Sequence, residues 1–272
     1  MTGPKRVAAL VLDRLGLLPL AMDLYQGIRG RVAWGPRGAI APAELVGGLA
    51  VPGPLLRQSS AGTADLRWFL EGGRLARQSI EEGLRAAGVE LRSIGAMLDL
   101  GCGCGRVLRQ WAELRGLEIH GTDYNRRAVA WCRRNLPFAR IGRNGLRPPL
   151  SYADGSFDLV YALSVFTHLT EPGQRAWMAE LHRVLRPGGH LLLTTHGRAY
   201  LDQLTPGERE AFERGELVVR AEEAAGTNLC GSYHPRGWLE SAFHGQFEPV
   251  LFTPEGALGN PPQDLHVLRR RP

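Results

Sequence analysis

The chain has 272 residues, of which 44% are hydrophobic, so it is long enough for one large domain and too apolar for extended disorder. Its net charge of +6, from 33 Lys and Arg against 27 Asp and Glu, is mostly dispersed arginine, which fits a GC-rich genome better than a nucleic-acid groove. No stretch reaches the ~20 apolar residues of a membrane span, and Asp13 and Arg14 interrupt the only segment that resembles a signal peptide, so we expect a cytoplasmic protein.

The first 64 residues differ in composition from the remainder of the chain. Residues 5–28 carry apolar side chains at roughly helical spacing, interrupted near Pro19. Such an amphipathic arm either packs on the domain or contacts a membrane surface or a partner, and packing is favoured. Residues 29–64 are rich in glycine and proline and predict an irregular connector. We therefore separate an arm and connector at 1–64 from a domain at 65–272.

A helix is predicted from Asp65 to Ala87, with a break at the pair Gly72–Gly73. An apolar strand at 96–100 then runs into alternating glycines at Gly101, Gly103 and Gly105. A buried strand that ends in a glycine turn and continues into a helix presents backbone to a nucleotide-like ligand. This strand and turn are the centre of the predicted site.

From residue 96 onward, apolar strands alternate with amphipathic helices. Strands are predicted at 96–100, 117–121, 138–141, 157–163 and 190–195, and helices at 106–114, 126–134 and 172–185. This alternation indicates a parallel sheet that is covered by helices on both faces.

The alternation lapses over residues 197–234, which we interpret as an insert on the substrate side. Segments 216–220 and 227–233 predict a small hairpin inside it. A helix at 235–243 follows, with Pro235 in its first turn. Strands at 247–252 and 265–268 close the chain and are near enough in sequence to pair antiparallel.

Four cysteines are present: Cys102, Cys104, Cys132 and Cys230. Two of them lie inside the glycine turn, where a disulfide between residues i and i+2 is strained. A zinc site needs a second pair of ligands at a recognisable spacing, and the sequence offers none. We expect reduced, packed thiols and no metal.

The glycine spacing restricts the class of ligand. A dinucleotide fingerprint, G-x-G-x-x-G, places its third glycine where this chain has Arg106. The pattern here is G-x-G-x-G, which favours a nucleoside ligand without a pyrophosphate. Asp123, at the end of the second predicted strand, either accepts hydrogen bonds from ribose hydroxyls or caps the helix that follows.

Taken together, the ordered motifs resemble the class I S-adenosylmethionine-dependent methyltransferases. The resemblance covers roughly residues 65–270, and the motifs that carry it are MLDLGCGCGR, HGTDYN, DGSFDLVYA, VFTHL, LHRVLRPGGHLLLT and QDLHVL. It implies a Rossmann-like α/β fold: a seven-stranded, mostly parallel sheet with helices on both faces and an antiparallel final strand. It also implies S-adenosyl-L-methionine as the cofactor.

The resemblance assigns cofactor-binding roles by position. The turn of Gly101, Cys102 and Gly103 approaches the methionine portion of the cofactor, and Asp99 helps to hold its amino group. Asp123 takes the ribose hydroxyls.

The same resemblance places further residues around the adenine and the sulfur. Tyr124 covers the adenine, and Asn144 stands at a position, often acidic in the family, that hydrogen-bonds the adenine edge. Leu163 and Ser164 line the cofactor near its sulfur.

For a hydroxyl acceptor a base helps to remove the proton, and the candidates are three histidines and one tyrosine near strand ends. His168, after the fourth strand of the domain, either acts as that base or caps and packs its turn. His196, Tyr233 and His234 are weaker candidates. The remaining requirement is alignment of the acceptor in a site that excludes water.

The predicted activity is methyl transfer to a small molecule, most plausibly to a hydroxyl of a sugar or secondary metabolite. One alternative is a nucleic-acid or protein methyltransferase, and another is a protein that uses S-adenosylmethionine in a non-methylating reaction such as cyclisation. Residues 260–262, Asn-Pro-Pro, are similar to a loop of enzymes that methylate base amines, but they are followed by Gln263 and lie after the wrong strand. We therefore expect no nucleic-acid partner. The sequence carries no signal for oligomeric state.

Overall fold

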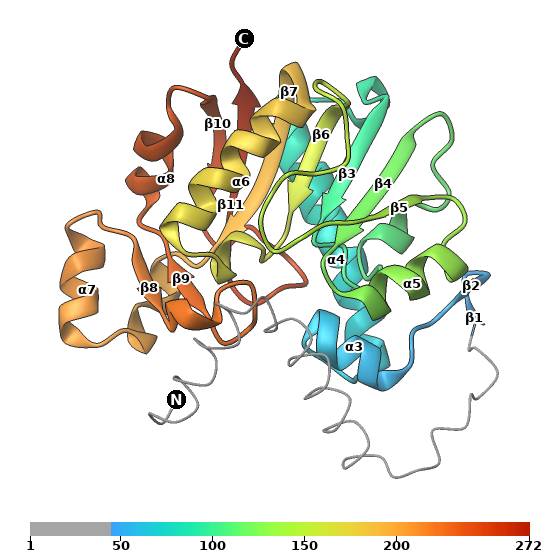
Figure 1. Ribbon diagram of the computed structural model, residues 1–272, viewed down its shortest axis with the longest axis horizontal. Helices are drawn as coiled ribbons and strands as arrows, with labels where there is room; N and C mark the ends of the chain where they lie inside the picture. Colours follow the sequence, from blue (N-terminus) through green and yellow to red (C-terminus); the bar gives the residue numbers. More distant parts are fainter. Residues whose placement is uncertain (1–44) are drawn as a thin grey trace.

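The computed structural model describes residues 45–272, and the predicted arm at 5–28 lies outside them. A seven-stranded sheet forms the centre of the domain, in the order β10-β11-β7-β6-β3-β4-β5 (Figure 1). Its strands are β3 (Ala96–Leu100), β4 (Glu118–Asp123), β5 (Arg140–Arg143), β6 (Phe157–Ala162), β7 (Leu185–Thr195), β10 (Phe247–Thr253) and β11 (Asp264–Arg270). The final strand, β11, is antiparallel to both β7 and β10. The predicted fold class is confirmed.

Helices cover the two faces of this sheet because successive side chains of each buried strand point in opposite directions. On β3, Leu98 packs toward α6 (Glu171–Val184) and α8 (Arg236–Phe243), whereas Met97 packs toward α4 (Leu66–Ala86). The helix α5 (Arg126–Asn135) contributes to the same layer as α4. No helix of the described residues is long and apolar enough to cross a membrane.

Helix α4 runs without a break through Gly72 and Gly73, so the predicted break is wrong. Asp65 caps it by accepting a hydrogen bond from the backbone of Trp68 at 2.6 Å. The glycines serve close packing: a Cβ on Gly73 would collide with the carbonyl oxygen of Arg106, and one on Gly72 would lie 3.0 Å from the carbonyl oxygen of Gly259. Both contacts bring α4 against segments that border the site.

Replacing Gly73 with alanine is expected to destabilise the protein by about 2 kcal/mol, because the backbone of Arg106 must move to admit one methyl group. Gly207→Ala is the control, since a Cβ there meets nothing within 4 Å, and it should change stability by less than about 0.5 kcal/mol. Urea unfolding of both variants measures the difference. Equal midpoints for the two variants would refute the close approach of α4.

Two predictions before β4 need correction. The connector at 29–64 contains a small hairpin, β1 (Leu45–Val46) with β2 (Leu49–Ala50), and a helix, α3 (Pro54–Ala61). The proline at the first position of α3 and the left-handed glycine just after it, Gly62 at φ 73°, are helix start and stop signals. The high glycine and proline content of this segment predicts only an irregular connector, so it does not reveal the hairpin or the helix.

The helix predicted at 106–114 is a single short 3-10 segment, Leu108–Trp111. Its apolar residues, Leu108, Trp111 and Leu114, recur every three positions, which is the period of a 3-10 turn. Its hydrogen bonds follow the same period, as from the Gln110 amide to the Val107 carbonyl at 2.9 Å. The side chain of Arg109 is buried and donates to carbonyls of the β1–β2 hairpin.

The insert at 197–234 contains the predicted hairpin, with β8 (Val218–Arg220) antiparallel to β9 (Gly231–Tyr233). It also holds an unpredicted helix, α7 (Pro206–Glu213), which begins with a capping box between Thr205 and Glu208. Figure 1 shows this insert, in orange, at one side of the sheet. A chain segment of the insert thereby reaches the carboxyl ends of the strands.

Candidate cofactor and acceptor site

The turn after β3 depends on its glycines. Gly101, Gly103 and Gly105 all have positive φ, a region that side chains disfavour. At Gly101 a Cβ would also lie 2.6 Å from a methyl of Val165. The Gly101 amide donates to the Thr122 carbonyl at 2.8 Å, which fixes the turn against the end of β4. The backbone of this turn, with no side chain in between, therefore borders the space beside Gly101.

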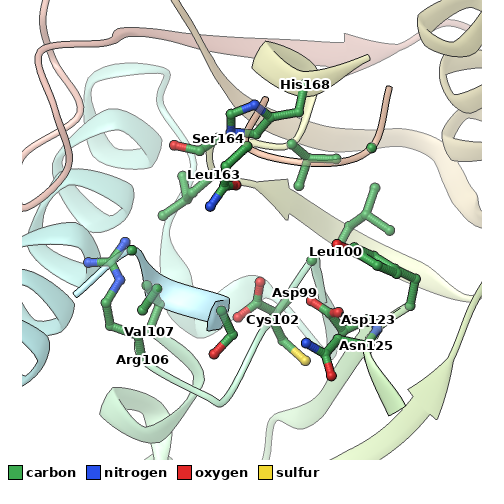
Figure 2. Close-up of a pocket in the computed structure, with 18 of the residues that line it drawn as sticks. Asp99, Leu100, Cys102, Arg106, Val107, Asp123, Asn125, Leu163, Ser164 and His168 are labelled. Atoms are coloured by element: carbon green, nitrogen blue, oxygen red, sulfur yellow. Dashed lines mark hydrogen bonds between the residues drawn. The ribbon is translucent and has the colours of Figure 1, made fainter. Parts of the chain in front are cut away.

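A cavity of about 590 Å³ opens at the carboxyl ends of the parallel strands, a size typical of small-molecule sites. Most of the sequence-predicted residues line it: Asp99, Gly101, Cys102, Asp123, Tyr124, Asn144, Leu163, Ser164, His168 and His196. Figure 2 shows Leu163, Ser164 and His168 on one side, facing Asp99, Cys102 and Asp123 across the cavity. The structure thus brings ten of the thirteen predicted site residues to one cavity.

Asp123 is held rigidly at this edge. Its carboxylate accepts the Gly103 amide and the Asn125 amide, each at 2.8 Å, although only 8% of the residue is exposed. Burial raises its pKa, and these backbone hydrogen bonds oppose that effect. It does not cap α5, because the side chain of Asn125 accepts from the first-turn amides of that helix. The Tyr124 backbone amide also hydrogen-bonds this carboxylate, and the acceptor capacity that remains is available to a ligand.

Asn144 lies beyond Asp123 along the same edge. Its side-chain oxygen accepts from the Thr122 hydroxyl at 2.9 Å, and its amide nitrogen donates to the Gly145 carbonyl at 2.7 Å. Its backbone amide donates to the Asp123 carbonyl at 3.2 Å. Asn144 is thus tied to the ends of β4 and β5 while it lines the cavity.

Asp99 is the most strongly perturbed acid of the cavity. Burial raises its pKa to about 7, and the charge of Asp123 adds to the effect, whereas a hydrogen bond from Tyr161 and the charge of Arg106 oppose it. The Tyr161 hydroxyl in turn accepts from the indole of Trp111 at 2.9 Å, so its own proton is directed to Asp99. A buried carboxylate with a raised pKa is stabilised in its charged form when a cationic ligand binds beside it.

We expect the affinity for S-adenosylhomocysteine to rise with pH between 6 and 8. The Asp99 carboxyl is protonated below its raised pKa of about 7 and cannot then pair with the ligand ammonium, so affinity should fall up to ~10-fold per pH unit below that point. Calorimetry at pH 6, 7 and 8 tests this. Asp99→Asn should flatten the profile, and a flat profile in the unmodified protein would contradict the assignment.

His168 enters the cavity from the 3-10 turn Phe166–His168 that follows β6. Its Nδ1 lies 2.8 Å from the carbonyl oxygen of Cys230. A carbonyl only accepts, so the proton of the neutral ring sits on Nδ1 and Nε2 keeps its lone pair. Burial lowers the pKa of His168, and the Cys230 carbonyl partly restores it. The capping alternative fails, because Thr170 caps α6.

Of the other three catalytic candidates, one lines the cavity and two lie outside it. His196 lines the cavity and stacks near Tyr200, with ring centroids 4.1 Å apart, and burial lowers its pKa to about 4. Tyr233 and His234 do not line the cavity. Tyr233 packs within the insert, and His234 is 1% exposed with its Nε2 3.0 Å from the Gln174 side-chain oxygen. Gly103 also stands back, beneath Ser60 of α3.

Several lining residues were not assigned from sequence. They include residues from three separated segments: Ser60 and its neighbours at the end of α3, Asn228 in the insert, and residues 260–263 before β11. Arg106 joins two walls of the cavity, because it donates to the Gly259 carbonyl at 3.0 Å and stacks over Trp68. The sequence marks this wall only through the Asn-Pro-Pro run at 260–262 and the motif QDLHVL, neither of which predicts a contact with the ligand.

The comparisons with known proteins agree on one family. A methyltransferase domain family matches residues 98–193. A probable S-adenosylmethionine-dependent methyltransferase of Mycolicibacterium smegmatis is 31% identical over 157 residues, which are 55% of this chain and 60% of that protein. The chloroplastic tocopherol O-methyltransferase of Arabidopsis thaliana is 32% identical over 174 residues, which are 60% of this chain and 46% of that protein. The chain therefore spans about half the length of these relatives.

Among solved structures, the glycopeptide N-methyltransferase MtfA in complex with S-adenosylmethionine superposes with a TM-score of 0.51 at 18% identity. The superposition covers 72% of this chain and 94% of that one, and it concerns the fold. The ordered motifs, the sheet with its antiparallel β11 and the matched domain family converge. Together they support a class I S-adenosylmethionine-dependent methyltransferase domain in this chain.

Proposed function

We propose that the protein transfers a methyl group from S-adenosylmethionine to a hydroxyl of a small molecule. The observation that carries the proposal is His168, whose Nδ1 is held by the Cys230 carbonyl while the ring lines the same cavity as Asp99 and Asp123. A neutral imidazole with one fixed proton is suited to accept another from a hydroxyl. The similarity to a tocopherol O-methyltransferase supports the same kind of acceptor.

The residues present fit the cofactor. The φ of 78° at Gly101, and the absence of room for a Cβ there, leave the backbone available at close range to the methionine portion. Asp99 offers a carboxylate for the ammonium, and Asp123 offers its remaining lone pairs to the ribose hydroxyls. When bound, S-adenosylmethionine supplies an electrophilic methyl on a sulfonium.

His168 and the surrounding wall perform the protein's part of the transfer. His168 Nε2 accepts the proton of the attacking hydroxyl, which makes the oxygen a better nucleophile as it approaches the methyl carbon. Val165, Trp177 and Leu146 line the cavity and exclude water from it. Trp68, 40% exposed, borders the cavity and offers an aromatic face to the acceptor.

The proposal is tested with S-adenosylmethionine labelled with ¹³C at the methyl and a panel of hydroxylated sugars, phenols and polyols. Label recovered as an O-methyl group supports it. Binding of the cofactor together with label that leaves in a rearranged product would favour a non-methylating reaction. Transfer to oligonucleotides or proteins in preference to the panel would overturn the small-molecule assignment.

A further inference from the structure

Gln263, which lies directly before β11, has no role in the chemistry described so far. It is 2% exposed, yet it lines the cavity. Its carbonyl accepts the Ala257 amide at 3.1 Å, which anchors its backbone within the loop between β10 and β11. A buried amide side chain at a cavity wall needs partners for both its ends.

The oxygen end of the Gln263 amide is fully used. Its Oε1 accepts the Ser164 hydroxyl at 2.9 Å and the Thr194 hydroxyl at 2.7 Å. The Thr194 hydroxyl itself accepts the Ser164 amide at 2.8 Å and donates its proton to Gln263 Oε1. In this arrangement the amide oxygen of Gln263 points to the two hydroxyls. Only the N–H donors of the amide remain for the cavity.

These contacts tie together the ends of three strands, because Ser164 follows β6, Thr194 lies in β7 and Gln263 precedes β11. Ser164 is held at a φ of 59°, which a side chain adopts only when its surroundings enforce it. Ser164 and His168 lie on the same side of the cavity (Figure 2). Gln263 therefore presents rigid donors close to the base.

We propose that Gln263 is a specificity-determining residue that donates a hydrogen bond to the accepting atom and thereby selects oxygen over nitrogen. This inference rests on the proposed function. A hydroxyl oxygen has two lone pairs. One forms the new C–O bond as the carbon–sulfur bond breaks, the proton passes to His168 Nε2, and the second lone pair accepts from the Gln263 amide. The products are the methyl ether and S-adenosylhomocysteine.

An amine cannot satisfy the same arrangement. A neutral amine has a single lone pair, which is consumed in the attack on the methyl, so the N–H groups of Gln263 face N–H groups of the acceptor. An ammonium has no lone pair for the attack and would approach the same donors. The fixed orientation of the amide prevents it from turning its oxygen toward such an acceptor, because two hydroxyls hold that oxygen.

The test uses acceptors that differ in one atom, such as a phenol and the matching aniline, and cyclohexanol and cyclohexylamine, with Gln263→Met as the variant. The unmodified protein should methylate the oxygen member at least about tenfold faster, and Gln263→Met should lose about tenfold on the oxygen member only, so that the ratio approaches one. Thr195→Val, which removes the neighbouring buried hydroxyl of β7 that contacts His266 and not Gln263 and does not line the cavity, is the structural control. It should leave the oxygen-to-nitrogen ratio unchanged.

The outcomes separate the two proposals. Calorimetry with S-adenosylhomocysteine should give similar affinities for the unmodified protein and both variants, and no binding to any of them would overturn the proposed function itself. Cofactor binding without transfer to any hydroxyl of the panel would also overturn the proposed function. Transfer to hydroxyls with faster methylation of the nitrogen members, or with equal loss of the ratio in Thr195→Val, would overturn the role of Gln263 alone.

Discussion

Replacing Asp123 with alanine weakens S-adenosylhomocysteine binding by about a hundredfold if this carboxylate holds the ribose. The variant loses charge-assisted hydrogen bonds to the ligand, each worth about 1.5–3 kcal/mol. It also leaves the Gly103 and Asn125 amides without their acceptor, which loosens the glycine turn. Both effects lower affinity, and calorimetric titration measures them together.

The control for this variant lies on the same strand. Glu118→Ala removes an acid from the opposite, exposed end of β4, where its partners are surface groups, and should leave ligand affinity within about twofold because exposed ion pairs contribute little. Thermal unfolding shows whether each variant is folded. A folded Asp123→Ala protein with unaltered affinity would contradict the ribose role.

Replacing His168 with alanine should reduce turnover by about 10²–10³-fold while cofactor affinity changes by less than about threefold. The expected loss follows from the fixed tautomer of His168. His196, the other histidine of the cavity, is a weaker base because burial lowers its pKa to about 4. In the unmodified protein, kcat/KM should fall as the pH drops through the lowered pKa of His168, because the protonated ring cannot accept a proton. The alanine variant should lose that limb.

His244→Ala is the matched histidine control, since His244 is exposed on the turn after α8 and bonds only the Ser241 carbonyl. Added imidazole should restore part of the activity to His168→Ala and none to a misfolded protein. Turnover that is unchanged in His168→Ala would show that alignment of the acceptor suffices without a base.

The parallel core could be predicted because its signals are local. Ala96–Leu100 is a run of five buried residues that ends at a glycine, and FDLVYA and HLLLT have the same character. The glycine turn follows β3, Asp123 ends β4 and Asn144 follows β5, and parallel strands place their carboxyl ends at one edge of the sheet. Their common position around one cavity therefore followed from strand order alone.

The errors arose where residues far apart in sequence determine the structure. Gly72 and Gly73 weaken a helix by intrinsic propensity, but the approach of Arg106 and Gly259 requires their lack of a side chain. Gln263 gave no signal because its partners, Ser164 and Thr194, lie about 100 and 69 residues earlier. His234 follows a predicted strand as His196 does, yet its ring packs against Gln174. Side-chain direction at a strand end depends on packing.

The central claim is that the cavity beside Gly101 holds S-adenosylmethionine. Isothermal titration of the unmodified protein with S-adenosylhomocysteine tests it most directly, since this ligand keeps the ribose, adenine and ammonium groups and carries no transferable methyl. We expect one binding site per chain in the micromolar range, weakened about a hundredfold in Asp123→Ala. Absence of binding at millimolar ligand, or equal affinity in the two proteins, would contradict it.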